Sequence, residues 1–448
     1  MPTESELVAY AQERDQEALR LHALYHGKVQ MAPKCPIRTP ADFSYWYTPG
    51  VAAPCREIQA DPSAVYQLTN KSNLIAVVSD GSRVLGLGNI GPLAGLPVME
   101  GKALLFKYLG GVDAVAICLA TQDPRELVRT VQLLEPSFGA INLEDIAQPR
   151  CFRVLDELRK TLSIPVWHDD QQGSATTLLA GLLGALIVVG KKITSIKIGM
   201  IGMGAANYSV YRLLRAYGVN PAQIIACDST GTLHRNRTDL AKLQAEFPEK
   251  WAVCQESNPE AVAGGIEQAL RGADVCIAFS RSDPELIKPD WIRSMAADAI
   301  VFACANPVPE IFPWIAREAG ARIAATGSGE WPNQVNNSLA FPGIFRGVLD
   351  AQAVAITDEM ALAAAFELAS IAQEQGLNEE AIIPKMAEVD VAARVAAATA
   401  LKAQELGLAR VSLTRDEYVK AASRRILDSR KMMRALMAEH VIAPLPGG

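Results

Sequence analysis

Short, continuous apolar runs separated by helical or glycine-rich stretches constrain the fold of this chain more than any other feature. The first series covers residues 74–79, 112–120, 140–143 and 164–167. The second series covers residues 195–202, 223–229, 274–280, 299–307 and 321–329. Apolar strands separated by helices are typical of parallel sheets with both faces covered. The pattern therefore predicts an α/β fold with two doubly wound parallel sheets.

The two series divide the chain into two domains. We expect a first domain over residues 1–165 and a second, Rossmann-type dinucleotide-binding domain over residues 166–448. From about Asp358 onward the sequence is rich in Ala, Glu and Lys and has no strand pattern, so the second domain should end in a helical segment. The length of 448 residues suits two domains, because domains usually span about 100–200 residues.

Composition excludes several classes of protein. The chain has 43 Lys and Arg against 49 Asp and Glu, a net charge of −6, and it is 50% apolar. That mild acidity supplies no basic face for a nucleic acid, and the high apolar content excludes intrinsic disorder. The eight cysteines are widely spaced and form no CxxC motif, which is typical of small buried side chains in a reducing compartment.

One segment requires a comparison with membrane helices. Residues 174–190 are almost uncharged, but these 17 positions are slightly fewer than the ~20 that a bilayer requires. The segment also contains three glycines and directly follows the acidic pair Asp169-Asp170, so we expect a buried core helix. The acidic N-terminus does not resemble a secretory signal. We therefore expect a cytoplasmic protein without a membrane partner.

A glycine-rich turn after the first strand of the second series predicts dinucleotide binding. Gly202 and Gly204 precede a helical stretch, with Ala205, Ala206 and Asn207 completing the turn. The first glycine allows the tight turn, and the second lets backbone N–H groups approach a pyrophosphate at the helix N-terminus. Asn207 stands where a third glycine is usual, which should weaken or respace the contact between helix and strand. The alternative is a tight turn without a ligand.

An acidic residue strengthens the nucleotide hypothesis. Asp228 closes the next strand, 24 residues after Gly204, near where an acid that binds the ribose is expected. It is followed by Ser229 and Thr230 rather than by Arg or Lys, which favours NAD. Arg235 and Arg237 lie close downstream, so NADP remains an alternative dinucleotide.

Carboxylates gather after two runs of the first series. Glu144 and Asp145 follow one run, and Asp169 and Asp170 follow another that should be its neighbour in the sheet. Without Cys or His ligands, such a cluster suits a hard ion such as Mg²⁺ or Mn²⁺. Four acids also require a nearby cation, and Lys102 is the candidate. The alternative is a pair of solvated loop ends.

Two asparagine motifs and a tyrosine complete the candidates. Asn306 ends a strand of the second series, and Asn337 precedes a turn rich in small residues. Asparagine at a strand end can bind a small carboxylate or carboxamide, but it equally often stabilises a turn. Tyr47 precedes a Thr-Pro turn, where packing is an equally good explanation.

Six motifs, taken together and in order from about residue 24 to 350, resemble the bacterial malic enzyme family. They are YTPGVAAPC, SDGSRVLGLGNIGPLAGLPVMEGKALLFK, INLEDIAQPRCF, WHDDQQGSAT, CANPVPEI and PNQVNNSLAFPGIFRG. The resemblance implies oxidative decarboxylation of L-malate to pyruvate and CO₂ with NAD(P)⁺ and Mg²⁺ or Mn²⁺. It also implies a homodimer or a larger assembly of dimers.

The resemblance also implies residue roles, motif by motif. Lys102 would be the general base, Tyr47 the general acid, and Asp169 the residue that tunes Lys102. The implied metal ligands are Glu144, Asp145 and Asp170. The implied substrate-binding residues are Arg83, Asn306 and Asn337. The implied dinucleotide-binding residues are Gly202, Gly204, Ala205, Ala206, Asn207, Asp228 and Asn306.

Two alternatives stay open at this point. A malolactic enzyme of the same family would retain NADH and release lactate. A non-catalytic protein that binds a dinucleotide is the alternative from another class, although the presence of Tyr47, Lys102 and all three metal carboxylates argues against it. An unrelated amino-acid dehydrogenase would not explain the carboxylate cluster.

Overall fold

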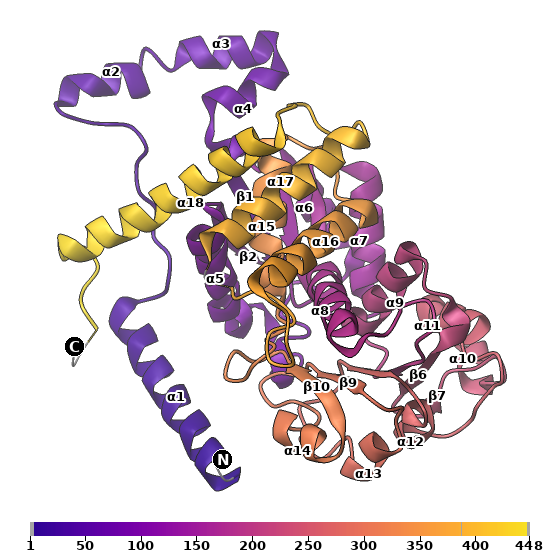
Figure 1. Cartoon of the computed structure of the whole chain (residues 1–448). Coiled ribbons are helices and arrows are strands. Elements are labelled where there is room, and N and C mark those ends of the chain that lie inside the picture. Colours follow the sequence, from indigo (N-terminus) through magenta and orange to yellow (C-terminus); the bar gives the residue numbers. More distant parts are fainter. Residues whose placement is uncertain (1–3, 387, 446–448) are drawn as a thin grey trace.

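Each series of apolar runs forms one sheet in the computed structural model, which describes residues 4–386 and 388–445 (Figure 1). The first sheet has the strand order β2-β1-β3-β4, and all its pairs are parallel. Its strands are β1 (Leu74–Ser79), β2 (Asp113–Cys118), β3 (Ala140–Leu143) and β4 (Val166–His168). The predicted α/β class with parallel sheets is therefore confirmed.

The second sheet has the order β10-β9-β8-β5-β6-β7 and is parallel except for its last pair. Its strands are β5 (Ile198–Ile201), β6 (Ile224–Asp228), β7 (Gly231–Thr232), β8 (Val275–Ala278), β9 (Ala299–Ala303) and β10 (Ala321–Thr326). The chain reverses its direction across the sheet between β5 and β8, which creates the switch point where open α/β sheets bind ligands. The short antiparallel β7 was not predicted, because two residues carry no periodic pattern.

Burial on both faces explains the unbroken apolar runs. In β1, Ile75 and Val77 pack towards Met99 and Phe106 of α5 (Gly91–Gly110). The intervening Ala76 and Val78 pack towards α6 (Pro124–Leu134) and α7 (Arg150–Thr161) on the other face. Both faces of β1 are therefore apolar, as expected for a central parallel strand.

The second sheet is covered in the same way. On one face lie α8 (Ser174–Val189) and α9 (Ala205–Tyr217). On the other lie α12 (Ile266–Leu270), α13 (Pro289–Arg293) and α14 (Pro313–Glu318). Two further helices, α10 (Thr238–Lys242) and α11 (Pro248–Glu256), follow β7.

The apolar segment around α8 is a core helix, as predicted. Residues Asp169–Val189 form the one candidate span among the described helices that is long and apolar enough to cross a membrane. However, 72% of its most apolar window is buried inside the molecule. The helix packs against α9 and α16, so its apolar surface is covered by protein.

The four C-terminal helices are α15 (Phe341–Asp350), α16 (Asp358–Gln375), α17 (Val389–Glu405) and α18 (Arg415–Ala438). Three of them pack against the first sheet's α5, and the other, α16, packs against α8 and α17. Phe106 of α5 contacts the rings of Phe341 and Phe345, with centroids 4.5 and 4.9 Å away. The buried Arg346 bonds the side chain of Asn73 and forms a 2.8 Å ion pair with Asp350. The helical segment therefore connects the two units.

The N-terminal segment stands away from this body (Figure 1). It contains α1 (Glu4–Tyr25), α2 (Phe43–Trp46), α3 (Ala52–Ala60) and α4 (Val65–Leu68). We call residues 26–60 the N-terminal arm. Much of the arm is solvent-exposed, including the large side chains of Phe43, Tyr45 and Trp46.

Candidate active site

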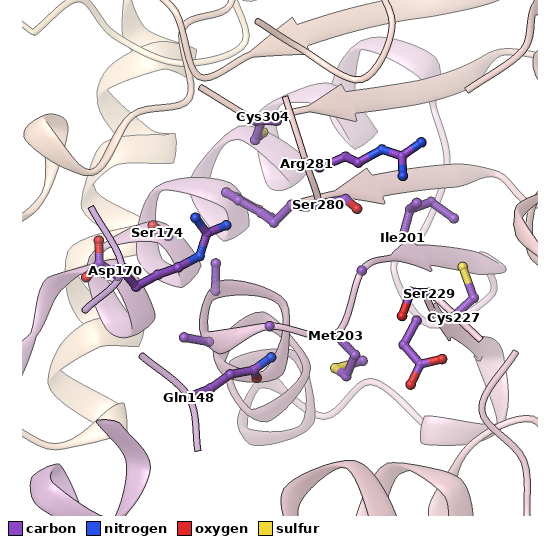
Figure 2. Close-up of a pocket in the computed structure, with 18 of the residues that line it drawn as sticks. Gln148, Asp170, Ser174, Ile201, Met203, Cys227, Ser229, Ser280, Arg281 and Cys304 are labelled. Atoms are coloured by element: carbon purple, nitrogen blue, oxygen red, sulfur yellow. The ribbon is translucent and has the colours of Figure 1, made fainter. Parts of the chain in front are cut away.

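A single large cleft lies where the carboxyl ends of the two sheets face each other. Its volume is about 1290 Å³, more than the 300–1,000 Å³ of a typical small-molecule pocket. Both units line it: Figure 2 shows Asp170 and Ser174 on one side and Ile201, Met203 and Ser229 on the other. A cleft of this size has room for a dinucleotide and a second small molecule.

Lys102 is the central cation of the first wall. It lies on α5, its side chain is only 8% exposed, and its Nζ donates to Asp169 Oδ2 at 2.6 Å. The same Nζ lies 2.9 Å from Glu144 Oε1 and 4.4 Å from the centre of the Phe341 ring. Burial alone would lower the pKa of Lys102, but Asp169 and Glu144 outweigh it and raise the pKa above its usual value. In this arrangement Lys102 is a firmly held ammonium.

The four predicted carboxylates converge, because β3 and β4 are adjacent and parallel. Glu144 and Asp145 follow β3, Asp169 and Asp170 follow β4, and the Asp145 N–H donates to Asp170 Oδ2 at 2.8 Å. Burial, together with the nearby charge of Asp170, raises the pKa of Asp145 to about 8. Burial also raises the pKa of Glu144 well above its usual range. The cluster therefore has more carboxyl groups than Lys102 can neutralise, and without a further cation some of them are held in the protonated form near neutral pH.

The backbone around Asp145 is unusual. Its φ is 54°, in the left-handed region that non-glycine residues seldom adopt. The Arg83 N–H donates to the Asp145 carbonyl at 3.0 Å and helps to hold this conformation. Such conformations are often retained at functional sites.

The cluster fits a hard divalent cation in ligand type and charge. All its ligand atoms are carboxylate oxygens, and the buried Asp145 Oδ2 has no hydrogen-bond partner in the described structure. No three His, Cys, Asp or Glu side chains of the described residues are already arranged as a metal cage. Glu144 instead uses its two oxygens on Lys102 and on Asn142, whose amide donates at 2.7 Å. A cation would therefore replace contacts that Glu144 makes here.

The glycine turn of the second wall forms as predicted, with one correction. Gly202 has a φ of +83°, and a Cβ there would lie 2.6 Å from the Phe279 carbonyl oxygen. Nothing lies within 4 Å of a Cβ at Gly204, which is open towards the cleft. Asn207 does not loosen the turn: its Nδ2 donates to the carbonyls of Ile201 and Gly202 at 2.9 and 2.7 Å. At the position where a third glycine is usual, the hydrogen bonds of the Asn207 side chain thus hold the turn in place.

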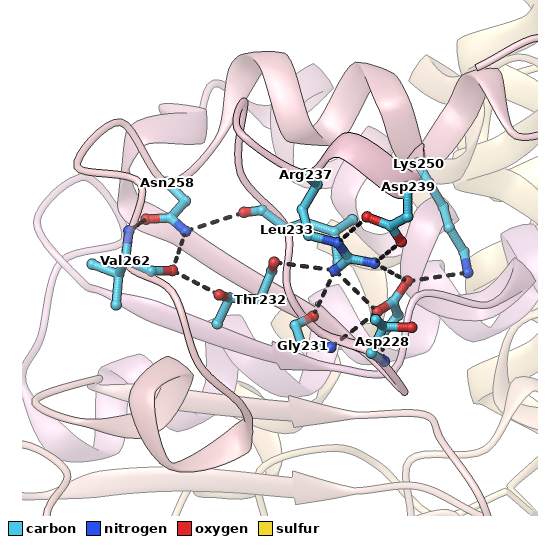
Figure 3. A network of polar contacts seen from close by, with 10 residues as sticks. Asp228, Gly231, Thr232, Leu233, Arg237, Asp239, Lys250, Asn258 and Val262 are labelled. Atoms are coloured by element: carbon cyan, nitrogen blue, oxygen red, sulfur yellow. Dashed lines mark hydrogen bonds and ion pairs between the residues drawn. The ribbon is translucent and has the colours of Figure 1, made fainter. Parts of the chain in front are cut away.

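Asp228 lies in a network of charges at the end of β6 (Figure 3). Its carboxylate is 3.2 Å from Arg237 Nη1 and 3.6 Å from Lys250 Nζ. Arg237 is also held by Asp239 through two 2.7 Å bonds. Arg235, in contrast, donates to the Pro259 carbonyl. Of the two predicted arginines, only Arg237 therefore contacts Asp228.

The structure brings most of the remaining predicted residues to the cleft. Arg83, Asn306 and Asn337 line it, together with Ala205 and Ala206. Residues that sequence reasoning missed include Lys250 and Ser280, which also line it. A lysine in a charged helix and a serine after a strand are too common to carry a signal.

Tyr47 is the exception. It caps α2 on the N-terminal arm, is 70% exposed and does not line the cleft. Within one chain, the predicted general acid is therefore separate from Lys102 and the carboxylates. The residues around Tyr47 do not indicate which surface, of this chain or of another copy, the N-terminal arm packs against.

Together these features define a class: a two-domain α/β protein that holds a nucleotide-type turn and a lysine–carboxylate cluster in one cleft. Residues 26–159 match the family model "Malic enzyme, N-terminal domain", and residues 171–404 match "Malic enzyme, NAD binding domain". The chain belongs to the malic enzyme family, as the resemblance of its motifs predicted.

Individual relatives agree with this assignment. The chain is 46% identical over 406 residues to a bifunctional malic/malolactic enzyme of Bacillus subtilis, covering 90% of this chain and 96% of that one. It is 48% identical to an NAD-dependent malic enzyme of Geobacillus stearothermophilus, covering 86% and 78%. The crystal structure of Entamoeba histolytica malic enzyme aligns with a TM-score of 0.96 at 43% identity, covering 100% and 93%.

Proposed function

We propose that this protein oxidises and decarboxylates L-malate to pyruvate and CO₂ while reducing NAD⁺ or NADP⁺, with Mg²⁺ or Mn²⁺ as the metal. One observation carries the proposal: Lys102 and its carboxylates face the Gly202–Asn207 turn across the same cleft. A hydroxy acid bound at the first wall would thus lie next to a dinucleotide bound at the second.

We also propose a cytoplasmic location, since all eight cysteines are free thiols.

The proton of the malate C2 hydroxyl is assigned to Lys102. Lys102 Nζ would take this proton when a bound nicotinamide accepts the C2 hydride, and Nζ must be neutral to do so. Asp169 fixes the position of Nζ, and the Trp167 indole donates to Asp169 Oδ1 at 3.0 Å and fixes Asp169 in turn. Glu144, Asp145 and Asp170 would hold a divalent cation, which would supply Lewis acidity next to the substrate and would offset the carboxylate charges that raise the Lys102 pKa.

Arg83, Asn306 and Asn337 are assigned to the substrate's carboxylate groups. Arg83 is exposed in the cleft and donates through Nη1 to the Leu85 carbonyl at 2.8 Å, which leaves other guanidinium donors for a ligand. The two asparagines supply neutral amide donors from the second unit. Binding from both walls would orient C2 towards the dinucleotide.

We further propose a homodimer in which the N-terminal arm of one copy supplies Tyr47 to the cleft of the other. Tyr47 would then protonate C3 of the enolpyruvate left after CO₂ departs. Two surfaces support this arrangement. The arm exposes Phe43, Tyr45 and Trp46, and the segment at the mouth of the cleft exposes Leu87 and Leu93. Exposed apolar patches of this kind are typical of protein–protein contacts.

For the dinucleotide, we propose that NAD⁺ is preferred and that NADP⁺ is also accepted. Asp228 is placed to accept a bond from a ribose 2′-hydroxyl, which favours NAD⁺. Arg237 and Lys250 beside it supply positive charge that would attract a 2′-phosphate.

The malolactic reaction is the second candidate, because the Bacillus subtilis relative is named a bifunctional malic/malolactic enzyme. In that reaction the bound NADH would reduce pyruvate to lactate before release. The two activities share the same first chemical steps and differ in whether reduced dinucleotide leaves.

The test combines purified protein, L-malate, Mn²⁺ and either NAD⁺ or NADP⁺. We expect absorbance of the reduced dinucleotide to rise with equimolar pyruvate. Lactate without net NADH would support the malolactic reaction instead. Absence of both products with either dinucleotide, in folded protein supplied with metal, would overturn the proposal.

A further inference from the structure

A buried carboxylate without a cation lies behind the floor of the cleft. Glu310 is fully buried and follows the loop after β9. Its Oε1 accepts the Ser280 N–H at 2.7 Å, and its Oε2 accepts the Ala305 N–H at 3.0 Å. Within the described part of the chain, no Lys or Arg side chain forms an ion pair with it.

The two N–H groups belong to the loops that form the cleft floor. Ser280 follows β8 and Ala305 follows β9, and both line the cleft. Ser282 adds a second link between these loops, since its Oγ donates to the Val308 carbonyl at 3.0 Å and accepts the Val308 N–H at 2.9 Å. One carboxylate and one hydroxyl thus join the two loops.

Both loops also contact the parts of the site assigned to ligands. A Cβ on Gly202 would lie 3.1 Å from the Ser280 Cβ, so the loop after β8 packs directly against the glycine turn. The loop after β9 carries Asn306, one residue beyond Ala305. Any shift of either loop would therefore change the surface that faces a dinucleotide.

The chemistry of the group explains why a carboxylate is used. The two N–H donors bond different oxygens of the side chain, and a carboxylate has two acceptor oxygens whereas a carboxamide has only one. Burying an unpaired charge costs free energy, and burial raises the pKa of Glu310 to about 7 although the two backbone N–H groups oppose the rise. On protonation, both bonds lose their charge-assisted character and the hydroxyl oxygen becomes a poorer acceptor, so one of the two links is weakened.

Few other titratable groups face Glu310. The thiols of Cys276 on β8 and Cys304 after β9 are its neighbours, and burial raises the pKa of both well above the usual range, so they stay neutral. On the surface segment that follows Ser280, Arg281 pairs with Asp283, and Lys288 pairs with Glu285. These pairs are solvent-exposed and balance their own charges.

We propose that Glu310 is a positioning residue: its ionised carboxylate holds the loops after β8 and β9 in the conformation that binds the dinucleotide. The inference rests on the proposed function only in requiring that the cleft binds a dinucleotide. Ionised Glu310 keeps Ser280 against the glycine turn and Asn306 at the cleft surface. Protonated Glu310 holds one loop less firmly, and the dinucleotide then binds more weakly.

The test measures the Kd of NADH and of NADPH by fluorescence from about pH 6 to about pH 9, a range that brackets the transition. For the wild type we expect a constant Kd above about pH 8 and roughly a tenfold rise towards pH 6, the effect of weakening one charge-assisted hydrogen bond. Glu310→Gln should bind about tenfold more weakly at high pH, with no pH dependence. Glu310→Asp keeps a carboxylate and should retain a pH dependence.

His234 supplies a control, because it lines the cleft and is a titratable imidazole, although burial and the charge of Arg237 lower its pKa below the usual value. The pH dependence should persist in His234→Gln. Loss of the pH dependence in His234→Gln would overturn the inference about Glu310 but not the proposed function. Equal Kd values for wild type and Glu310→Gln at every pH would do the same. Failure of the wild type to bind either NADH or NADPH would overturn the proposed function as well. If Glu310→Gln does not fold, Glu310→Asp decides the question: its shorter side chain cannot reach both N–H groups as Glu310 does, so its pH profile should differ from that of the wild type, and an identical profile would overturn the inference.

Discussion

The two walls of the cleft differ in how their carboxylates are paired with cations. On the first wall, Glu144, Asp145, Asp169 and Asp170 share one buried lysine, and the pKa values of the first three are raised by burial and by one another's charge. On the second wall, Asp228 lies between Arg237 and Lys250, and Asp239 holds Arg237 from the other side. The first wall has more carboxyl groups than cations to pair with them, whereas the carboxylates and cations of the second are balanced.

The difference shows which wall is complete within one chain. The paired charges and the fixed glycine turn of the second wall are already in place for a ligand, because Asp228, Arg237 and Asp239 are paired with one another and the Asn207 amide holds the turn. The first wall has an orphaned Asp145 oxygen and an ammonium too firmly held to act as a base. In our proposal it therefore depends on two groups from outside the chain, namely a cation and a second copy's tyrosine.

Lys102→Ala is expected to have the largest effect and to separate the two walls. Removing the general base should lower kcat by roughly 10²–10⁴-fold. The Kd of NADH should stay near the wild-type value, because Lys102 belongs to the opposite wall. Steady-state kinetics and fluorescence titration measure the two quantities. Lys107→Ala is the matched control on α5, since Lys107 pairs with Asp113 at 2.7 Å outside the cleft. Wild-type turnover in Lys102→Ala would remove the assigned role.

Mixing two inactive variants tests whether the first wall is completed by a second copy. Tyr47→Phe should lower kcat by about 100-fold or more, because it removes the general acid. If Tyr47 acts on the partner's cleft, exchanging subunits with Lys102→Ala should restore about a quarter of wild-type activity, since half of the molecules become mixed dimers with one intact site.

The control for this experiment is Tyr45→Phe, which changes an equally exposed tyrosine on the same short helix. It should leave turnover close to wild type. Mixed dimers detected by native mass spectrometry but without recovered activity would show that Tyr47 does not act on the partner's cleft.

Because the first wall has more carboxyl groups than cations, we expect a divalent metal to increase the stability of the folded protein. Mn²⁺ at 100 times its Kd should add about 2.7 kcal/mol to the free energy of unfolding, which corresponds to a rise in Tm of roughly 5 °C. A chelator should reverse the rise. Asp145→Asn should abolish most of it and should itself raise the Tm of the metal-free protein, because it removes a carboxyl group that must take up a proton to be buried near neutral pH. The control is Asp239→Asn on the balanced wall, where the response to Mn²⁺ should persist. Equal responses in all three proteins would place the metal elsewhere.

The sequence predicted those parts of the molecule that follow from local patterns. β1 was predictable because Ile75 to Val78 are buried on both faces, and unbroken apolar runs record that burial. The meeting of Glu144 and Asp145 with Asp169 and Asp170 was predictable because both pairs follow neighbouring parallel strands. Once the runs are assigned to one sheet, their ends must meet at one edge.

Other features depend on partners distant in the sequence. Nothing near Glu310 shows that its carboxylate is buried against the N–H groups of Ser280 and Ala305. The C-terminal helices were predictable as helices, but their packing on Phe106 of α5 was not, because an apolar stripe does not specify its partner. The position of Tyr47 was equally unpredictable, since the direction of an exposed arm is not recorded in its own residues.

The smallest predicted effect concerns the balanced wall and the choice of dinucleotide. In Asp228→Asn, the ribose 2′-hydroxyl of NAD⁺ loses a charged acceptor, while Arg237 and Lys250 lose their shared counter-charge and face a 2′-phosphate unopposed. The ratio of kcat/KM for NADP⁺ to that for NAD⁺ should therefore rise by roughly tenfold or more, the value of one charge-assisted hydrogen bond. Lys250→Ala should shift the ratio the other way. Asp228→Asn with an unchanged ratio would show that the network at β6 stabilises the fold without selecting the dinucleotide.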